Sequence, residues 1–530
     1  MTSSLAVAKG RAQLTGWIPT LPKDTAPLFD SLTSSAGALQ FRLHSGELTS
    51  VQILREYYRQ ILSFNGYLRA IHQLAPGAMA RAEHLDQLRR EGFVLGPLHG
   101  IPVLLKDNIG TDGSFEMDTT AGSPALVASI PRRNSPIVDQ LVDAGAIILG
   151  KATLSELNWF KGHKVSSGWS SLCGQGQNPY VMGGYDRSDG ISGHSGPGGS
   201  SSGSCIAVAA GLAPISIGTD TEGSINCPAT RNSLYSIKPS RGSVSNELIV
   251  PISSYLDVAG PIGTTTEDIA NLLTVLVGSN RPDVPSGGYL TAMRGADGWE
   301  ELSVGVLDPE KWRYDGSIQT ENPSAIQDIK RITLEAYDRI RCLAKSYHFD
   351  VSLRHDRDFN YEGGNGIVEI MIADFERDFD RYLEDTINTK VQSVKELLQW
   401  NYANEHIALP AENPGQESLE EALSFPRSTD RREKLLKHIK EVGQSFPDTL
   451  EKYSIDVIIG PGDSWFTKYS AATGFPNCSL PIGYIDFRGR PVGLTAIARS
   501  EVTLIKLMSA HEASFPARKP PSAFLEHKDL

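Results

Sequence analysis

Two stretches of the sequence each predict a helix that leads straight into an apolar strand. In residues 135–151, SPIVDQLVDAGAIILGK, Ser135 caps the helix, Pro136 occupies its first position and Gly145 ends it before the strand. The same order returns in residues 205–218, CIAVAAGLAPISIG. A helix that runs directly into a buried strand packs back on the sheet. The chain is therefore predicted to be an α/β protein, with a mixed sheet wrapped by helices.

The same patterns divide the chain into four parts. Residues 1–95 are predicted to be N-terminal helices that pack on the core, and residues 96–299 to be the core with its chemical motifs. Charged amphipathic segments fill residues 300–450, which favours a helical excursion on one side of the core. This excursion is interpreted as a substrate-shaping region, with ordinary surface helices as the alternative. Strand patterns return in residues 451–530, which are expected to complete the core.

The charge balance excludes several classes of partner. The formal net charge is −12, so no basic surplus exists to bind nucleic acid or an anionic membrane. No stretch approaches eighteen apolar residues, so no membrane span is expected, and the first residues do not read as a signal peptide. A small-molecule or peptide substrate is the expected partner.

Cysteine and histidine usage bears on location and metals. The five cysteines are widely spaced and form no CxxC pair, which favours reduced thiols in a cytoplasmic protein. The twelve histidines show no metal-ligand spacing, so neither a metal nor a cofactor is expected.

A Gly/Ser-rich run, GPGGSSSGS at 196–204, is a candidate for a linker, a phosphate loop or a reactive serine. The preceding GHSGP fails the G-x-S-x-G pattern at Pro197, and no GK[ST] follows to bring a lysine to a phosphate. The run leads into a helix of small residues, whose first N–H groups are free. The residues alone do not choose among its serines.

Two further segments qualify the linker interpretation. An apolar strand, PISIG, leads into a second Gly-flanked serine, Ser224, within residues 214–229. Upstream, the strand IPVLLKDN carries Lys106 after five mostly apolar residues, so this lysine is expected to be buried.

Six sequence blocks in order resemble the amidase signature family. They are GPLHGIPVLLKDNIGT, TTAGS, AGAIILGKATLSE, PGGSSSGS, GTDTEGSINCPA and the closing GFPNCSLPIGY with GRPVGLTAIAR. The resemblance covers roughly residues 45–285 and 395–515 and is greatest to the peptide amidase-like branch. In that branch an acidic residue precedes the Gly-Ser of the nucleophile block, and Cys-Pro or a similar pair follows. The resemblance implies an amidase-signature α/β/α fold and hydrolysis of a carboxamide C–N bond.

The resemblance also implies a Ser-Ser-Lys triad. Lys106 matches the family's lysine, Ser200 its bridging serine after a cis peptide bond, and Ser224 its nucleophile. The two serines lie 24 residues apart, which agrees with the family pattern and selects Ser200. Four backbone N–H groups match the oxyanion hole, namely those of Thr221, Glu222, Gly223 and Ser224.

The chemistry of such a triad is self-consistent. A serine hydroxyl needs a base, and lysine serves only when neutral, which burial promotes by lowering its pKa. Ser200 would carry the proton between Ser224 and Lys106, and water would resolve an acyl-enzyme. Ser123 and Thr219 are expected to orient the relay or the hole, and Asp220 to bond backbone groups. Among the other motif residues, a structural role is expected for Lys151, Lys238, Cys205 and Cys227.

Two departures from the family pattern stand out. Glu222 replaces the usual glycine, so its carboxylate is expected to point away from the developing oxyanion. Residues 180–196 are longer than the usual connection, and are expected to form a surface loop or to border the substrate entrance.

Other functions remain open at this stage. A glutamine-dependent amidotransferase A subunit, a non-catalytic binding protein of the same fold and acyl transfer to an amine are the alternatives. The acyl specificity is left open, and a homodimer is a further expectation.

Overall fold

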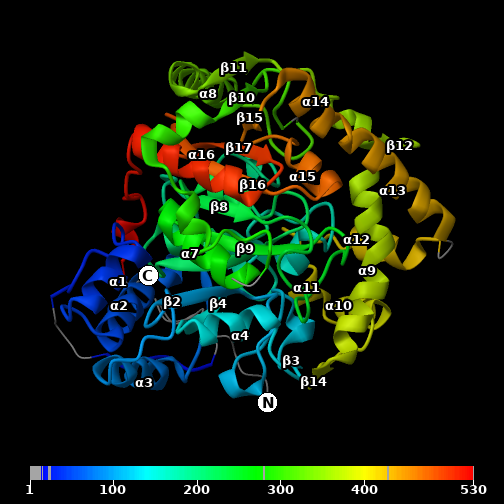
Figure 1. Ribbon diagram of the computed structural model, residues 1–530. Helices are drawn as coiled ribbons and strands as arrows, with labels where there is room; N and C mark the ends of the chain where they lie inside the picture. Colours follow the sequence, from blue (N-terminus) through cyan, green and yellow to red (C-terminus); the bar gives the residue numbers. More distant parts are fainter. Residues whose placement is uncertain are drawn as a thin grey trace.

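The computed structural model describes residues 14, 16–21, 26–278, 281–314, 316–426 and 429–528. A mixed sheet of eleven strands crosses the middle of these residues (Figure 1). Its spatial order is β1 (Ile71–Leu74), β4 (Ile147–Ala152), β2 (Pro102–Lys106), β7 (Ile215–Asp220), β9 (Val258–Gly263), β8 (Tyr235–Lys238), β16 (Asn477–Tyr484), β17 (Pro491–Ala498), β15 (Val457–Pro461), β10 (Ser303–Val306) and β11 (Ser346–Phe349). The predicted α/β fold with a mixed sheet is confirmed.

Parallel pairing is confined to two parts of this sheet. Strand β2 lies between β4 and β7 and runs parallel to both. Strands β15, β10 and β11 are parallel to one another near the far edge. The strands from β7 through β15 pair antiparallel, and β1 is antiparallel to β4 at the first edge. Because β2 is central and its burial is complete, a polar side chain at its end lies inside the protein.

The helix-then-strand segments fold as their sequences predict. Helix α4 (Pro136–Asp143) has proline in its first turn, and Gly145 follows it with φ +85° before β4 begins. Helix α5 (Ser202–Ala209) likewise leads into β7. Ser135 stands at the N-cap of α4, but its hydroxyl makes no capping hydrogen bond.

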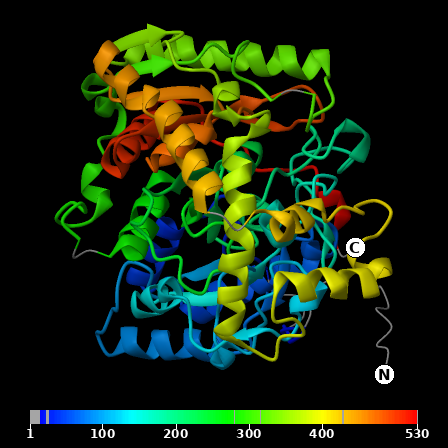
Figure 2. The same ribbon diagram turned by 90° about the vertical axis from the view of Figure 1, so that its right-hand side faces the viewer.

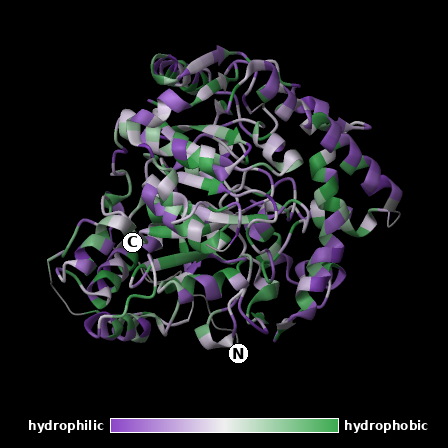
Figure 3. Ribbon diagram, viewed as in Figure 1, coloured by the Kyte–Doolittle hydropathy of each residue, from purple (hydrophilic) through white to green (hydrophobic). Residues whose placement is uncertain are grey.

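Helices cover the sheet on its sides. The first part of the chain supplies α1 (Ala36–His44), α2 (Ser50–Leu68) and α3 (Ala78–Arg90), which lie together at the lower left, on the side of the ribbon where β2 is labelled (Figure 1). Helices α7 (Thr266–Val277) and α16 (Glu501–Ser514) pack on the middle of the sheet, and α8 (Pro323–Leu343) packs on β16, β17 and β11. Hydrophobic residues are frequent in the middle of the ribbon, whereas the peripheral helices carry many hydrophilic residues (Figure 3).

The region 300–450 differs from the prediction in its first fifty residues. Strands β10 and β11 fall within it and extend the sheet: the apolar run SVGV of β10 is buried, and SYHF of β11 pairs with it at the sheet edge. The helix α8 lies between these two strands, and further helices follow as α9 (Gly366–Glu384), α10 (Val394–Ala403), α11 (Glu405–Ala408), α12 (Glu417–Ser424), α13 (Thr429–Gly443) and α14 (Ser445–Tyr453). Helix α9 stands upright in front of the sheet and contacts α12 and α13 (Figure 2).

In the described ranges, no helix combines the length and the apolar character that crossing a membrane requires.

Candidate active site

Lys106 ends strand β2 and is fully buried. Its Nζ lies 2.8 Å from the Ser200 Oγ, 2.8 Å from the Thr219 Oγ1 and 3.2 Å from the Thr219 carbonyl oxygen. Burial lowers the pKa of Lys106 to about 7, although the nearby carboxylates of Asp220 and Asp257 oppose the change. An amine with this pKa is partly neutral at neutral pH, which is the state that a base needs.

The Gly/Ser run lies between Lys106 and the turn that contains Ser224. The peptide bond between Gly199 and Ser200 is cis. The next residue, Ser201, donates its hydroxyl to the Thr219 carbonyl (3.0 Å) and its N–H to the Ser224 carbonyl (3.0 Å). These contacts bring the two serine segments side by side, with the Ser200 hydroxyl against the lysine.

Ser224 lies in the turn between β7 and α6 (Asn226–Arg231) and is half-buried. Asp220 shapes this turn, because its carboxylate accepts the N–H groups of Gly223 (2.8 Å) and Ile225 (2.6 Å). The Lys238 Nζ lies 3.5 Å from the same carboxylate. Gly223 has φ +91°, a conformation that residues with a side chain rarely adopt. Asp220 thus bonds backbone groups, as expected.

The hydrogen bonds that Asp220 accepts also limit which of the four predicted backbone N–H groups can serve an oxyanion hole. The Gly223 N–H is engaged by Asp220 in this structure. The N–H groups of Thr221, Glu222 and Ser224 are the remaining candidates. The Thr221 hydroxyl donates to Asp257 (2.6 Å) and its carbonyl accepts from Lys238 (3.2 Å), which holds this backbone in place.

Glu222 is partly buried and is directed toward a neighbouring helix. Its Oε1 accepts a hydrogen bond from the Thr467 hydroxyl (2.9 Å) at the start of α15 (Thr467–Thr473). Burial raises the pKa of Glu222 to about 7, against the opposing effect of Lys468.

Thr219 and Asn108 extend the lysine site. The Thr219 hydroxyl contacts Lys106, and the Asn108 amide donates to the same Thr219 Oγ1 (3.0 Å). Sequence reasoning did not identify Asn108, although its place two residues after Lys106, in LKDN, is a signal that was present. Ser123 is not joined to this group: its hydroxyl is buried and makes no hydrogen bond within the described part of the chain.

The other motif residues have structural surroundings. The Lys151 Nζ bonds the Ile109 carbonyl and the Thr119 hydroxyl. Cys205 and Cys227 are buried, and burial raises the pKa of both thiols.

The long connection 180–196 is folded against the core. Ser192, His194 and Ser195 are buried, and the Ser192 N–H donates to the Ile318 carbonyl (2.8 Å). Arg231 of α6 donates to the carbonyls of Ser192 (3.0 Å) and Gly193 (2.9 Å). The second half of this segment therefore packs against α6, the helix that follows Ser224.

Comparison with known proteins places the chain in a family. Residues 52–337 match the family described as Amidase. A probable amidase from Arabidopsis thaliana is 32% identical over 492 residues, which are 89% of this chain and 88% of that protein. The crystal structure of the peptide amidase from Stenotrophomonas maltophilia superposes with a TM-score of 0.80 at 30% identity, over 92% of this chain and 98% of that one.

A third relative matches over a shorter length. The A subunit of the glutamyl-tRNA(Gln) amidotransferase from Symbiobacterium thermophilum is 39% identical over 256 residues, which are 48% of this chain and 49% of that protein. The full-length similarities are therefore to amidases, and this chain belongs to the amidase family of amide hydrolases.

Proposed function

We propose that this amidase cleaves a linear carboxamide through a Ser-Ser-Lys triad made of Ser224, Ser200 and Lys106. The observation that carries the proposal is the set of three contacts around the buried Lys106 Nζ. A neutral amine has two N–H groups and one lone pair. It can donate to the Thr219 hydroxyl and carbonyl oxygens and accept from the Ser200 hydroxyl, which satisfies all three contacts.

In the proposed reaction the Ser224 Oγ attacks the carbonyl carbon of the amide. Its proton passes to the Ser200 oxygen as the Ser200 proton passes to Lys106. Backbone N–H groups of Thr221, Glu222 and Ser224 would stabilise the oxyanion, where one donor contributes about 3 kcal/mol to lowering the barrier. The relay then runs in reverse and protonates the leaving nitrogen, so that ammonia or an amine departs and an ester to Ser224 remains.

Water resolves this acyl-enzyme by the same relay. Lys106 takes a proton from the attacking water through Ser200, and the return of that proton to the Ser224 oxygen releases the carboxylic acid. An added amine in place of water would give a new amide, so analysis of the products with and without an amine separates hydrolysis from acyl transfer.

The alternatives have less support. The similarity to the amidotransferase covers about half of the chain, whereas the similarity to amidases covers most of it. A non-catalytic binding protein would not need a buried lysine in contact with a serine hydroxyl. We further propose a cytoplasmic location, since all five cysteines are unpaired, and a homodimer, which light scattering of the purified protein tests.

The proposal is tested by turnover of a 4-nitroanilide and a primary carboxamide by purified variants. Ser224→Ala and Lys106→Ala are expected to abolish turnover while circular dichroism and the melting temperature show an intact fold. Ser202→Ala is the matched control, because the Ser202 hydroxyl is buried in the same Gly/Ser run and makes no hydrogen bond among the described residues. Most of the activity surviving in Ser224→Ala would contradict the proposal.

A further inference from the structure

A buried carboxylate, that of Asp257, lies against the turn that carries Ser224. Asp257 directly precedes β9, and β9 is antiparallel to β7 with Val258 opposite Asp220. The residue after β7, Thr221, therefore meets the residue before β9, and the Thr221 hydroxyl donates to the Asp257 Oδ1 at 2.6 Å. Asp257 could not be identified from the sequence, because its contact depends on the pairing of β7 with β9.

Three donors hold this carboxylate in one orientation. Besides the Thr221 hydroxyl, the backbone N–H groups of Ile252 (2.8 Å) and Ser253 (3.1 Å) donate to its Oδ2. The Asp257 N–H donates to the Ser253 carbonyl (2.9 Å), which closes the loop before β9. A carboxylate that is bound at both oxygens cannot turn without breaking a charge-assisted hydrogen bond. The position of the Thr221 side chain is therefore fixed from the side of β9.

The loop that Asp257 closes also reaches the lysine site. This loop is the 250–257 segment, with the sequence VPISSYLD. Its first residue, Val250, donates its N–H to the Asn108 carbonyl (2.8 Å), and the Asn108 amide bonds the Thr219 hydroxyl that contacts Lys106. Its last residue accepts the hydroxyl of Thr221. One short segment thus contacts both the residues around the proposed base and the backbone proposed for the oxyanion hole.

Helix α9 anchors the middle of the 250–257 segment. The Ser253 hydroxyl donates to Asp374 (2.7 Å), and the Ser254 N–H donates to Asp378 (2.6 Å). Asp374 is fully buried, and Arg432 of α13 donates to its Oδ2 (3.0 Å) and balances its charge. Helices α9 and α13 therefore stabilise the position of the segment, and with it the position of the carboxylate at its end.

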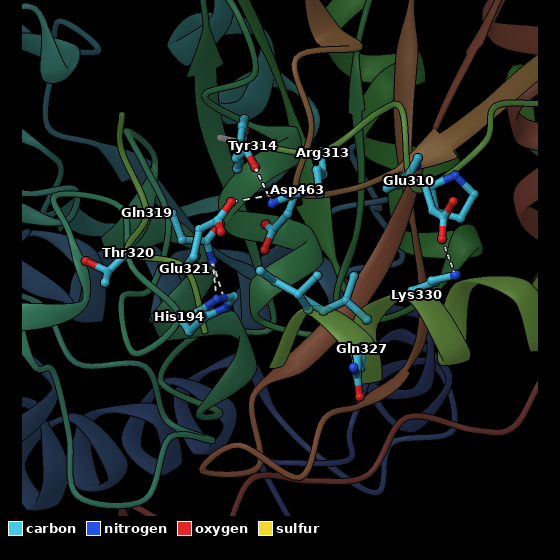
Figure 4. A pocket seen from close by; sticks show the side chains of 14 residues that line it. His194, Glu310, Arg313, Tyr314, Gln319, Thr320, Glu321, Gln327, Lys330 and Asp463 are labelled. Atoms are coloured by element: carbon cyan, nitrogen blue, oxygen red, sulfur yellow. Dashed lines mark hydrogen bonds and ion pairs between the residues drawn. The ribbon is translucent and has the colours of Figure 1, made fainter. Parts of the chain in front are cut away.

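Asp257 acts on the turn rather than on a bound molecule. The residue is only 9% exposed, and both of its carboxylate oxygens already accept hydrogen bonds. It does not line the cavity of about 400 Å³ beside the start of α8, whose wall includes Tyr314, Gln319 and Lys330 (Figure 4). What Asp257 can change is the direction of the Thr221 backbone, and hence of its N–H group.

We propose that Asp257 is a positioning residue for amide hydrolysis, which through the Thr221 hydroxyl sets the direction of the Thr221 N–H toward the oxyanion. The inference rests on the proposed function and adds to it a residue that acts through the oxyanion hole. An oxyanion donor is effective only when it points at the charge that develops in the transition state. A small change in its direction therefore lowers the rate of the chemical step and leaves the binding of the substrate nearly unchanged.

The test measures turnover of the 4-nitroanilide by Asp257→Ala, Thr221→Val and the double variant. Asp257→Ala is expected to lower kcat by about tenfold to a hundredfold and to leave KM within about twofold. Thr221→Val should cause a loss in the same direction, whereas Thr221→Ser keeps the hydroxyl and should keep most of the rate. Because both changes remove the same hydrogen bond, the double variant should be no slower than Asp257→Ala alone. Losses that multiply, or an unchanged kcat in Asp257→Ala, would overturn the inference. If Asp257→Ala does not fold, the two Thr221 variants carry the test, and equal rates in them would contradict it.

The conservative variant Asp257→Asn separates the hydrogen bond from the charge. Its amide oxygen can accept the two loop N–H groups while its amide N–H donates to the Thr221 oxygen, so most of kcat should return. The charge is lost, and because the Asp257 carboxylate raises the pKa of Lys106, the rise of kcat/KM with pH should move to lower pH. Asp220 and Cys205, which also act on the pKa of Lys106, are unaltered. Burial raises the pKa of Asp257 itself to about 7. A variant as slow as Asp257→Ala, or one that loses the rise altogether, would refute the positioning role.

Asp268→Ala is the matched control for the loss of a buried aspartate. Asp268 accepts the N–H groups of Ala36 (3.1 Å) and Gly37 (2.9 Å), and burial raises its pKa to about 7. It packs against Gly263 at the other end of β9, roughly 20 Å from Asp257 at 3.3 Å per residue. This variant should lose stability but keep kcat and the pH profile. An equal loss of kcat in Asp268→Ala and Asp257→Ala would show a general effect of destabilisation and would contradict the proposal.

A measurement without turnover separates this inference from the proposed function. Hydrogen exchange of the backbone amides in the peptide that contains residues 219–225 should be faster in Asp257→Ala and unchanged in Asp268→Ala, because only the first variant frees the turn. If Ser224→Ala remained active, the triad would fail, and the exchange result would still decide whether Asp257 holds the turn. If Ser224→Ala is inactive and exchange is the same in both aspartate variants, the triad stands and the positioning role fails.

Discussion

At position 106 the protein keeps an amine away from water, and three oxygen atoms surround it. The burial of Lys106 could be predicted from the apolar strand before it. Its contact with Thr219 could not, since that contact depends on the register of β2 against β7, which pairs residues more than a hundred positions apart. The choice of Ser200 among its neighbours came from the family resemblance, because every serine in the run has the same chemistry.

The pH dependence of turnover follows from the protonation of Lys106. With a pKa near 7, the lysine is protonated and unable to accept a proton in acid, and neutral above that pH. We expect kcat/KM to rise with pH through about 7 and then to level off, measured from about pH 5 to about pH 9.

A second group could give a similar profile, because the pKa of Glu222 is also about 7. Glu222→Gln distinguishes the two. If Lys106 is the base, the rise persists in this variant at nearly the same pH. Its disappearance would instead assign the profile to Glu222.

Thr219 is a positioning residue whose effect passes through Lys106. Thr219→Val removes the hydroxyl that accepts from the lysine, so the charged form loses a hydrogen bond and the pKa of Lys106 should fall further. We expect kcat to decrease by about tenfold or more and the rise in the pH profile to move to lower pH. Thr219→Ser should restore both, and an unchanged profile in Thr219→Val would contradict the role.

At the scale of elements, the turn from β7 to α6 is organised by one carboxylate. The sequence analysis predicted that Asp220 bonds backbone groups rather than acting as an acid. It did not predict that the Gly223 N–H would be one of those groups. Which donors a turn leaves free depends on its φ and ψ angles, and the motif alone does not fix these.

Asp220→Asn tests this organisation. Asparagine offers one acceptor oxygen where the turn uses two, and it leaves the buried Lys238 without its counterion. We expect a loss of about 2–3 kcal/mol in the free energy of unfolding and a large decrease in kcat. Denaturant titration and turnover measure the two effects. Asp283→Asn, an exposed aspartate paired with Arg281, is the control and should change neither.

At the scale of the whole molecule, a lysine of a buried ion pair in the core also bonds the helical part of residues 300–450. The Lys161 Nζ lies 2.9 Å from Glu156, both side chains are fully buried, and the lysine also donates to the Ala408 carbonyl of α11. The order of the motif blocks and the existence of a helical excursion could be predicted from the sequence. The participation of β10 and β11 in the sheet could not, because four-residue runs such as SVGV and SYHF carry too little periodicity to distinguish strand from helix.

The variant Lys161→Met removes the cation of the ion pair and the hydrogen bond to the Ala408 carbonyl. The variant leaves Glu156 buried without a counterion, so we expect a loss of about 3–5 kcal/mol in the free energy of unfolding. The double variant Glu156→Gln with Lys161→Met removes both charges and should recover part of that loss. Denaturant titration of the two variants measures their free energies of unfolding. Equal stability of the single variant and the unaltered protein would contradict the prediction.

Trapping the acyl group on the protein tests the Ser-Ser-Lys triad without relying on any one substrate. A 4-nitrophenyl ester is mixed with the enzyme, the reaction is stopped with acid within a turnover, and the modified residue is identified by peptide mass spectrometry. The proposed triad predicts one acyl group on Ser224, formed far more slowly in Lys106→Ala than in the unaltered protein. An acyl group on any other residue, or unaltered acylation of Ser224 in Lys106→Ala, would contradict it.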